Sequence, residues 1–341
     1  MLNLHNPGPY AMSQPLSATP GTGVRAESRL AHFPVALFAT VMGVAGLSLA
    51  WLKAQNLAGI PADIGEILRW VASILYLVLI ALYGMKVLRH PASVIADGAH
   101  PVKMNFFPAI SIGLLLLAIA WSDPAPAVAR WMLYLAAFAH LVFTIWALNR
   151  WLYHGRYKIE HANPAWFIPV VGNILVPIAG VKLVPTELNW FFFSIGLVFW
   201  LSLMAIMLNR LFFHDPLPAR LMPTLFILIA PPAVGFISYV ALTGVIDAFA
   251  QVMYFFALFL TLLLASNAWR FLRLPFFISA WAYAFPLAAM TIATFERAGH
   301  GGGRFYMGLG WLLLSILSII VFVLVIRTLQ AARAGHICVP E

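Results

Sequence analysis

The sequence has few charged residues and almost no cysteine. Asp, Glu, Lys and Arg make up 9% of the 341 residues, whereas hydrophobic residues make up 63%. In soluble globular domains about a quarter of the residues are charged. The single cysteine, Cys338, excludes a disulfide framework or a cysteine-based metal site within one chain. This composition therefore indicates an integral membrane protein.

Carboxylates are absent from the centres of the apolar runs. All eleven acidic residues lie in tails, in loops or in the first turn of a run. Because carboxylates inside a membrane mark proton relays and cation sites, this argues against a proton-driven pump and a cation channel. The sequence also has no P-loop, no G-x-S-x-G elbow and no H-E-x-x-H motif, and its histidines show no metal-ligand spacing. We therefore expect no enzyme, no cofactor and no metal site.

Long apolar runs dominate the sequence instead. Most have 18 residues or more without a central charge, which suits α-helices that cross a hydrocarbon layer of about 30 Å. A membrane β-barrel would show short alternating segments. We predict an all-α membrane fold with ten transmembrane helices. The spans are 33–52, 64–88, 107–121, 127–151, 164–184, 189–211, 221–243, 247–269, 275–295 and 305–329.

The basic residues predict the orientation of these helices. The net charge is +9, but Lys and Arg sit singly at helix ends, so we expect no nucleic-acid partner. With ten spans, 14 of the 20 basic residues lie on the side of the termini, which places both termini in the cytoplasm. Residues 1–31 are polar and are predicted to form a disordered tail, residues 32–333 the membrane domain, and residues 334–341 a second tail.

Proline occurs in every odd-numbered span and in no even-numbered span. Some prolines, such as Pro108, lie near a helix start, where proline is common. Five lie deeper in their spans, at Pro169, Pro177, Pro231, Pro232 and Pro286. Within a continuous helix each would cost about 3 kcal/mol. Irregular backbone at membrane depth is tolerated only inside protein or beside a water-filled cavity. We therefore predict five helical hairpins around a central pore, with kinked odd helices inside and even helices outside.

Polar residues within the spans have two open interpretations each. Asn173, Ser111 and Ser238, on odd spans, would either satisfy backbone groups and pack helices or line the pore. His140, on the fourth span, would be either a proton shuttle or an interhelical hydrogen-bond partner. The second is favoured because the span is even and has no acidic partner nearby. The glycine-rich segment 299–303 is predicted to be a hairpin loop, because no strand precedes it as in a phosphate cradle.

Phe285 precedes Pro286 in the run ISAWAYAFPLAAMTIATF. The chain has 26 phenylalanines, and most are expected to face lipid or to pack against other helices. The place of Phe285 beside a proline on a predicted inner helix points its ring toward the axis. A ring there would form a hydrophobic constriction that gates by steric block and dewetting.

Five segments of the odd spans resemble a known family in order and spacing. They are HFPVALFATVMGVAGLSLAW, HPVKMNFFPA, NPAWFIPVVGNILVPIAG, IAPPAVGFISY and WAYAFPLA. The family is that of tellurite-resistance/dicarboxylate transporters, which includes bacterial TehA and the slow-type anion channels of plant guard cells. The resemblance covers residues 33–329, nearly the whole chain apart from its N-terminal tail.

The resemblance implies a homotrimer in the bacterial inner membrane, with one pore in each ten-helix protomer. In this family small anions pass the pore passively and a phenylalanine on the ninth helix occludes it. That position is Phe285 here, and Tyr283 is a less favoured candidate. The other pore-lining or kink candidates are Ala39, Gly43, Pro108, Ser111, Pro169, Asn173, Pro177, Pro231, Pro232, Ser238 and Pro286. Ala39 stands where relatives often carry glycine, and its methyl group would narrow the pore.

We therefore expect a gated channel for small anions such as chloride, nitrate, carboxylates or oxyanions. The alternative is a proton-linked secondary transporter of C4-dicarboxylates, sulfite or tellurite-type oxyanions. The missing intramembrane carboxylate favours the channel.

Overall fold

The computed structural model describes residues 29–153, 155 and 157–339, and every regular element in this part of the chain is helical. The predicted N-terminal tail lies outside this part except for residues 29–31. So do residues 340–341 of the C-terminal tail. Nine helical stretches in the described part are long and apolar enough to cross a membrane. The all-α membrane fold predicted from the sequence is thus confirmed.

The helices follow one another as five packed pairs. We call the first members the inner segments. They are η1 (Val35–Leu37) with α1 (Phe38–Ala58); η2 (Lys103–Phe106) with α4 (Ala109–Trp121); η4 (Pro164–Trp166), α6 (Phe167–Val171), η5 (Gly172–Leu175) and α7 (Val176–Leu183); η6 (Ala219–Ile229) with α9 (Ala230–Thr243); and η7 (Ile278–Tyr283) with α12 (Ala284–Arg297).

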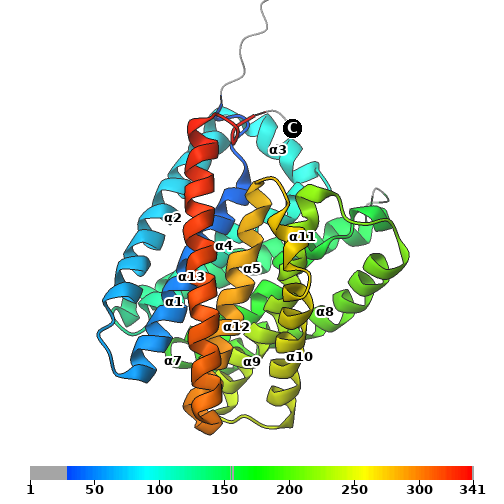
Figure 1. Cartoon of the computed structure of the whole chain (residues 1–341). Coiled ribbons are helices and arrows are strands. Elements are labelled where there is room, and N and C mark those ends of the chain that lie inside the picture. Colours follow the sequence, from blue (N-terminus) through cyan, green and yellow to red (C-terminus); the bar gives the residue numbers. More distant parts are fainter. Residues whose placement is uncertain (1–28, 154, 156, 340–341) are drawn as a thin grey trace, which may run out of the picture.

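We call the second members of the pairs the outer helices. They are α2 (Asp63–Arg89), α5 (Pro126–Tyr153), α8 (Thr186–Phe213), α10 (Ala248–Ala265) and α13 (Gly303–Arg333). Short helices lie between pairs or within the last one: α3 (Pro91–Ala99), η3 (Ile159–His161), α11 (Ala268–Leu272) and η8 (Ala298–Gly302). Figure 1 shows α3 at the same end of the molecule as the C-terminus.

Burial separates the two sets of helices. In the first four inner segments 67–83% of the most apolar stretch is buried within the protein, against 28–39% in the first four outer helices. In the last pair, ten of the 14 residues of α12 are buried, but only six of the 31 residues of α13. The helices with prolines at membrane depth are therefore inside and the unbroken helices outside, as the proline distribution predicts; among the outer helices only α5 contains a proline, Pro126, and it is the first residue.

The last membrane-length stretch, Ile278–Arg333, has 56 residues and contains two helices. A straight helix of this length would measure about 84 Å, far more than a bilayer core of about 30 Å. The backbone leaves the helical region at His300 and Gly301, and both Gly301 and Gly303 have positive φ angles, 86° and 74°. Here the chain turns, as predicted for the glycine-rich segment, and α13 packs against α12. Counted separately, α12 and α13 give ten long helical stretches in the described part of the chain, the same number as the spans expected from the sequence.

The prolines mark junctions between 3-10 and α-helical backbone. Pro177 is the second residue of α7, Pro231 the second residue of α9, and Pro286 the third residue of α12. The N–H groups of a first turn have no acceptor within the helix, so proline removes nothing there. The sequence interpretation, which places these prolines in helix interiors, is corrected: each inner segment is broken so that the cost does not arise.

Candidate functional site

A cavity of about 70 Å³ lies among the inner segments. Its wall receives residues from all five inner segments and, within the described part of the chain, from no outer helix. One residue from each segment is Ala39, Ala109, Val171, Pro231 and Phe285. The predicted inner ring requires a central cavity to which each of the five pairs contributes its inner segment.

The wall of this cavity carries no charged side chain. Its only polar side-chain groups belong to Ser279 and Trp281, and both already have partners. Ser279 Oγ donates to the backbone carbonyl of Arg220 at 2.5 Å, and Trp281 Nε1 donates to Thr328 Oγ1 at 2.9 Å. Such a wall offers no strong ligand to a passing ion, and weak binding lets an ion leave as well as enter.

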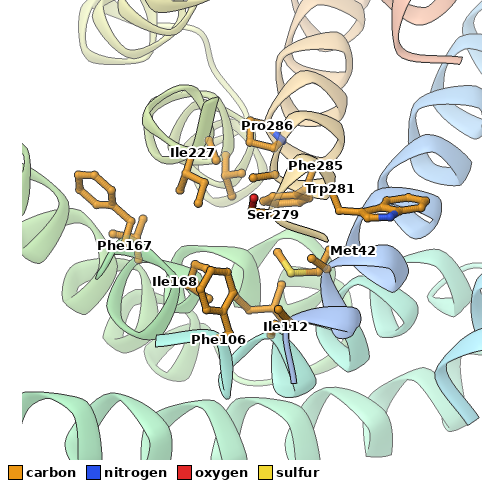
Figure 2. Close-up of a pocket in the computed structure, with 18 of the residues that line it drawn as sticks. Met42, Phe106, Ile112, Phe167, Ile168, Ile227, Ser279, Trp281, Phe285 and Pro286 are labelled. Atoms are coloured by element: carbon orange, nitrogen blue, oxygen red, sulfur yellow. The ribbon is translucent and has the colours of Figure 1, made fainter. Parts of the chain in front are cut away.

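Phe285 is half-buried and borders the cavity together with Pro286. Figure 2 shows Phe285, Pro286 and Trp281 in the upper part of the view, with Phe106 and Ile112 in the lower part. Tyr283 is not part of the wall. Its ring packs against Phe226 and Phe271, with ring centroids 4.8 and 6.0 Å apart. Of the two aromatic candidates, Phe285 is the one at the cavity.

A second, larger cavity of about 640 Å³ adjoins the first. We call it the vestibule. The two share four wall residues, Ala36, Phe106, Ile278 and Ser279. Ala334 and His336 also border the vestibule, which therefore lies at the end of the molecule that holds the C-terminus (Figure 1). Its wall includes the charged residues Asp97, Lys103, Arg220 and Arg327. The small cavity with no charged wall residue thus adjoins a larger one whose wall has more basic than acidic residues.

A family model described as SLAC1: Voltage-dependent anion channel matches residues 32–329. The match runs through all five pairs of helices and includes the whole wall of the central cavity. The chain belongs to this family. Membership confirms the resemblance drawn from the five sequence segments and makes the chain a membrane protein of channel and transporter type.

Three relatives show how far the similarity extends. The S-type anion channel SLAH3 of Arabidopsis thaliana is 27% identical over 307 residues, covering 88% of this chain and 48% of SLAH3. The uncharacterized transporter MJ0762 of Methanocaldococcus jannaschii is 25% identical over 345 residues, covering 91% of this chain and 98% of MJ0762. The tellurite resistance protein TehA homolog of Haemophilus influenzae is 25% identical over 260 residues, covering 75% of this chain and 79% of the homolog. The chain spans about half the length of the plant channels SLAH3 and SLAH2.

Four of the residues singled out from the sequence border the central cavity: Ala39, Pro231, Phe285 and Pro286. Ala39 stands at the wall in the first inner segment, so its methyl group occupies space that glycine would leave free. The other candidates are not part of this wall. They are Gly43, Pro108, Ser111, Pro169, Asn173, Pro177, Pro232 and Ser238.

Close packing and hydrogen bonding account for candidates that are not part of this wall. A Cβ atom on Gly43 would lie 2.7 Å from Trp281 Cε3, so this glycine lets α1 approach η7. Ser238 Oγ donates to the carbonyl of Ile174 at 2.5 Å and ties α9 to η5. Asn173 Nδ2 donates to Thr144 Oγ1 at 2.9 Å and to the carbonyl of Val170 at 2.7 Å. These side chains support the broken backbone.

His140 connects its outer helix to two inner segments. Ser111 Oγ shares a hydrogen bond with His140 Nδ1 and also donates to the carbonyl of Pro108, and each of these distances is 2.8 Å. The edge of the ring fills the space left by a glycine, because a Cβ atom on Gly172 would lie 2.5 Å from His140 Nε2. Gly172 itself borders the cavity. The interhelical hydrogen bond expected of His140 is confirmed.

Sequence reasoning did not single out most of the apolar wall. Met42, Ile112, Val171, Ile227 and Val234 are examples. Their spacing carries a signal: in each inner segment, wall residues recur three or four positions apart, as Ala39 and Met42 do. That stripe is hidden in the sequence, because the inner segments are apolar on every face and the breaks at proline shift the helical phase.

Proposed function

We propose that the chain conducts small anions, such as chloride, nitrate or a small carboxylate or oxyanion, passively across a lipid bilayer. The pore is the central cavity of each protomer, and the ring of Phe285 occludes it. The observation that carries this proposal is the cavity itself. It is bordered by all five inner segments, it has no charged wall residue, and Phe285 is part of its wall. Family membership and the names of the plant relatives support the same direction.

The assembly and orientation belong to the same proposal. Each protomer holds all five inner segments around its own cavity, so conduction needs no residue from a neighbour. A homotrimer, as the family resemblance implies, would contain three independent pores. The excess of basic residues on the side of the termini supports cytoplasmic termini in the bacterial inner membrane, with the vestibule facing the cytoplasm.

Current through planar bilayers tests the gate. Phe285→Ala should raise the anion current at least about tenfold over the parent, because it removes the ring that blocks and dewets the pore. The matched control is Phe259→Ala, since Phe259 lies on α10 with 57% of its surface exposed; its current should equal that of the parent. An equal current from the parent and Phe285→Ala, at equal protein incorporation, would refute the gate assignment.

The same recordings separate a channel from a proton-linked transporter. A channel predicts current that reverses near the anion equilibrium potential and does not depend on the pH gradient. Uptake that saturates and follows an imposed pH gradient would instead support transport of dicarboxylates or oxyanions.

A further inference from the structure

The vestibule is lined by more positive than negative charge. Lys103, Arg220 and Arg327 border it, and Asp97 is the only acidic residue in its wall. Lys86 neutralises that carboxylate: its Nζ lies 2.6 Å from Asp97 Oδ2, its side chain is 1% exposed, and it also donates to the carbonyl of Phe33 at 2.9 Å. Lys103 contacts the same carboxylate, since its Nζ lies 3.5 Å from Asp97 Oδ1. Two lysines thus share one carboxylate, and the wall keeps an excess of positive charge.

Arg220 and Arg327 lie close to the entrance of the central cavity. Their backbones are held there by neighbouring contacts, whereas their guanidinium groups have no partner among the described residues. The carbonyl of Arg220 accepts a hydrogen bond from Ser279, and Thr328, next to Arg327, accepts one from Trp281. Ser279 and Trp281 both border the central cavity. Among the described residues neither guanidinium has a carboxylate partner, and both arginines are exposed. Their backbones are thus held at the entrance while their side chains remain open to a ligand.

The size of the vestibule sets the kind of anion that fits. At about 640 Å³ it is in the range of small-molecule pockets. The central cavity beyond it has only about 70 Å³. An anion that fills the vestibule cannot follow chloride-sized ions through the entrance. A multivalent anion would contact several cations at once, and the planar fork of arginine matches phosphate oxygens in pairs.

From this arrangement we propose that the vestibule is a binding site for a polyphosphate chain, held by Arg220 and Arg327, which closes the pore from the C-terminal side. Such a chain occurs free or as part of a nucleotide. Phe106, Phe276 and Phe277 in the same wall offer rings on which a base could stack. Binding does not depend on conduction, whereas closure of the pore rests on the proposed channel function.

Calorimetric titration of the purified full chain with tripolyphosphate tests the site. The parent should bind with a saturable isotherm, and Arg220→Gln/Arg327→Gln should weaken the affinity at least about tenfold, because two charge-assisted contacts are lost. The matched control is Arg304→Gln on the same helix as Arg327. About 23 residues separate the two, or about 35 Å of helix, so Arg304 lies far from the vestibule and its variant should bind like the parent.

Three results would overturn the proposal: no saturable binding to the parent, unchanged affinity in the double variant, or an equal loss in Arg304→Gln. Since Arg220 and Arg327 are exposed, the double variant should keep the parental elution volume and melting temperature. Arg220→Lys/Arg327→Lys is a second variant, which retains the charge and should bind with intermediate affinity.

Two further titrations identify the source of the phosphate chain and its effect. ATP that binds more tightly than tripolyphosphate supports a nucleotide site, and equal affinities support a site for the phosphates alone. In Phe285→Ala, tripolyphosphate added on the vestibule side should reduce the current, and the arginine double variant should remove this block. If Phe285→Ala carries no current, the channel proposal fails while the calorimetric result still decides the binding site.

Discussion

The inner segments and the outer helices are similarly apolar, yet their backbones differ. Every inner segment contains 3-10 backbone, whereas each outer helix is one continuous α-helix of 18 to 31 residues. The outer helices expose large apolar side chains, and the inner segments border the cavity. Backbone N–H and C=O groups without a hydrogen-bond partner are not tolerated where they face lipid. They are tolerated where they face protein or a water-filled cavity. The location of a helix thus decides how irregular its backbone can be. Three pairs of substitutions, and one substitution at the start of an outer helix, test this contrast.

The largest contrast is expected from proline itself. Leu201→Pro places a proline in the exposed middle of α8, where it breaks a backbone hydrogen bond and clashes with the preceding turn, at a cost of about 3 kcal/mol or more. Pro232→Ala, in the first turn of α9, should cost only about 1–2 kcal/mol, since the backbone bonds stay as they are. Chemical unfolding in detergent measures both. Equal losses would contradict the distinction between the two layers.

Glycine gives the next contrast. Gly172→Ala should destabilise the fold by about 1–3 kcal/mol, because the added methyl group would overlap the His140 ring. Gly84→Ala on α2 has no atom within 4 Å of the new methyl group and should be stabilising by about 0.5–1 kcal/mol through helix propensity. Melting temperatures of the two variants should therefore move in opposite directions. A stabilising effect of Gly172→Ala would show that His140 is not packed into that space.

Serine tests the hydrogen bonds that join the layers. Ser111→Ala leaves His140 Nδ1 without its hydrogen-bond partner in a buried site and should cost about 1–3 kcal/mol. Ser202→Ala on the exposed face of α8 removes only a bond to the carbonyl of Val198 and should change stability by less than about 0.5 kcal/mol. Denaturant midpoints compare the two, and a silent Ser111→Ala would remove the support assigned to His140.

The smallest effect concerns a helix start. Asp247 is the N-cap of the outer helix α10, and its carboxylate accepts a hydrogen bond from the N–H of Ala250. This bond and a second one from the hydroxyl of Tyr239 hold the pKa of Asp247 below its ordinary value. The stabilisation is therefore present above the ordinary aspartate pKa and is lost as the pH falls through the lowered pKa. Asp247→Asn should remove this part of the acid dependence of the melting temperature, and an unchanged acid dependence would contradict it.

The sequence predicted the number, order and layering of the helices because each depends on composition along the chain. Long apolar runs define the spans, and proline separates the inner set from the outer set. The sequence did not predict the 3-10 stretches, such as the eleven residues of η6. Nor did it place the α1 end, which runs to Ala58 before Gly59 caps it with a positive φ of 64°. These features depend on tertiary contacts rather than on local propensity.

Part of the candidate site could also be predicted from composition along the chain. Phe285 and Pro286 could be assigned to the axis because proline marks the inner layer and the pair sits near the middle of its span. The direction of Asn173 could not be assigned, since it lies in η5 between two helical pieces, where the phase of the helix changes. Polar side chains in such a place satisfy the backbone beside them, and only the folded packing shows which way they turn.

The central claim is that anions pass through the cavity bordered by the inner segments, and filling that cavity tests it most directly. Val171 borders the cavity, whose wall has no charged residue, and is 7% exposed. Val171→Phe therefore adds a ring to the wall. In planar bilayers, Phe285→Ala/Val171→Phe should return the raised current of Phe285→Ala to the parental level. Phe285→Ala/Val252→Phe, with its new ring on the exposed face of α10, should keep the raised current. A current that persists unchanged in Phe285→Ala/Val171→Phe would show that the anions take another path.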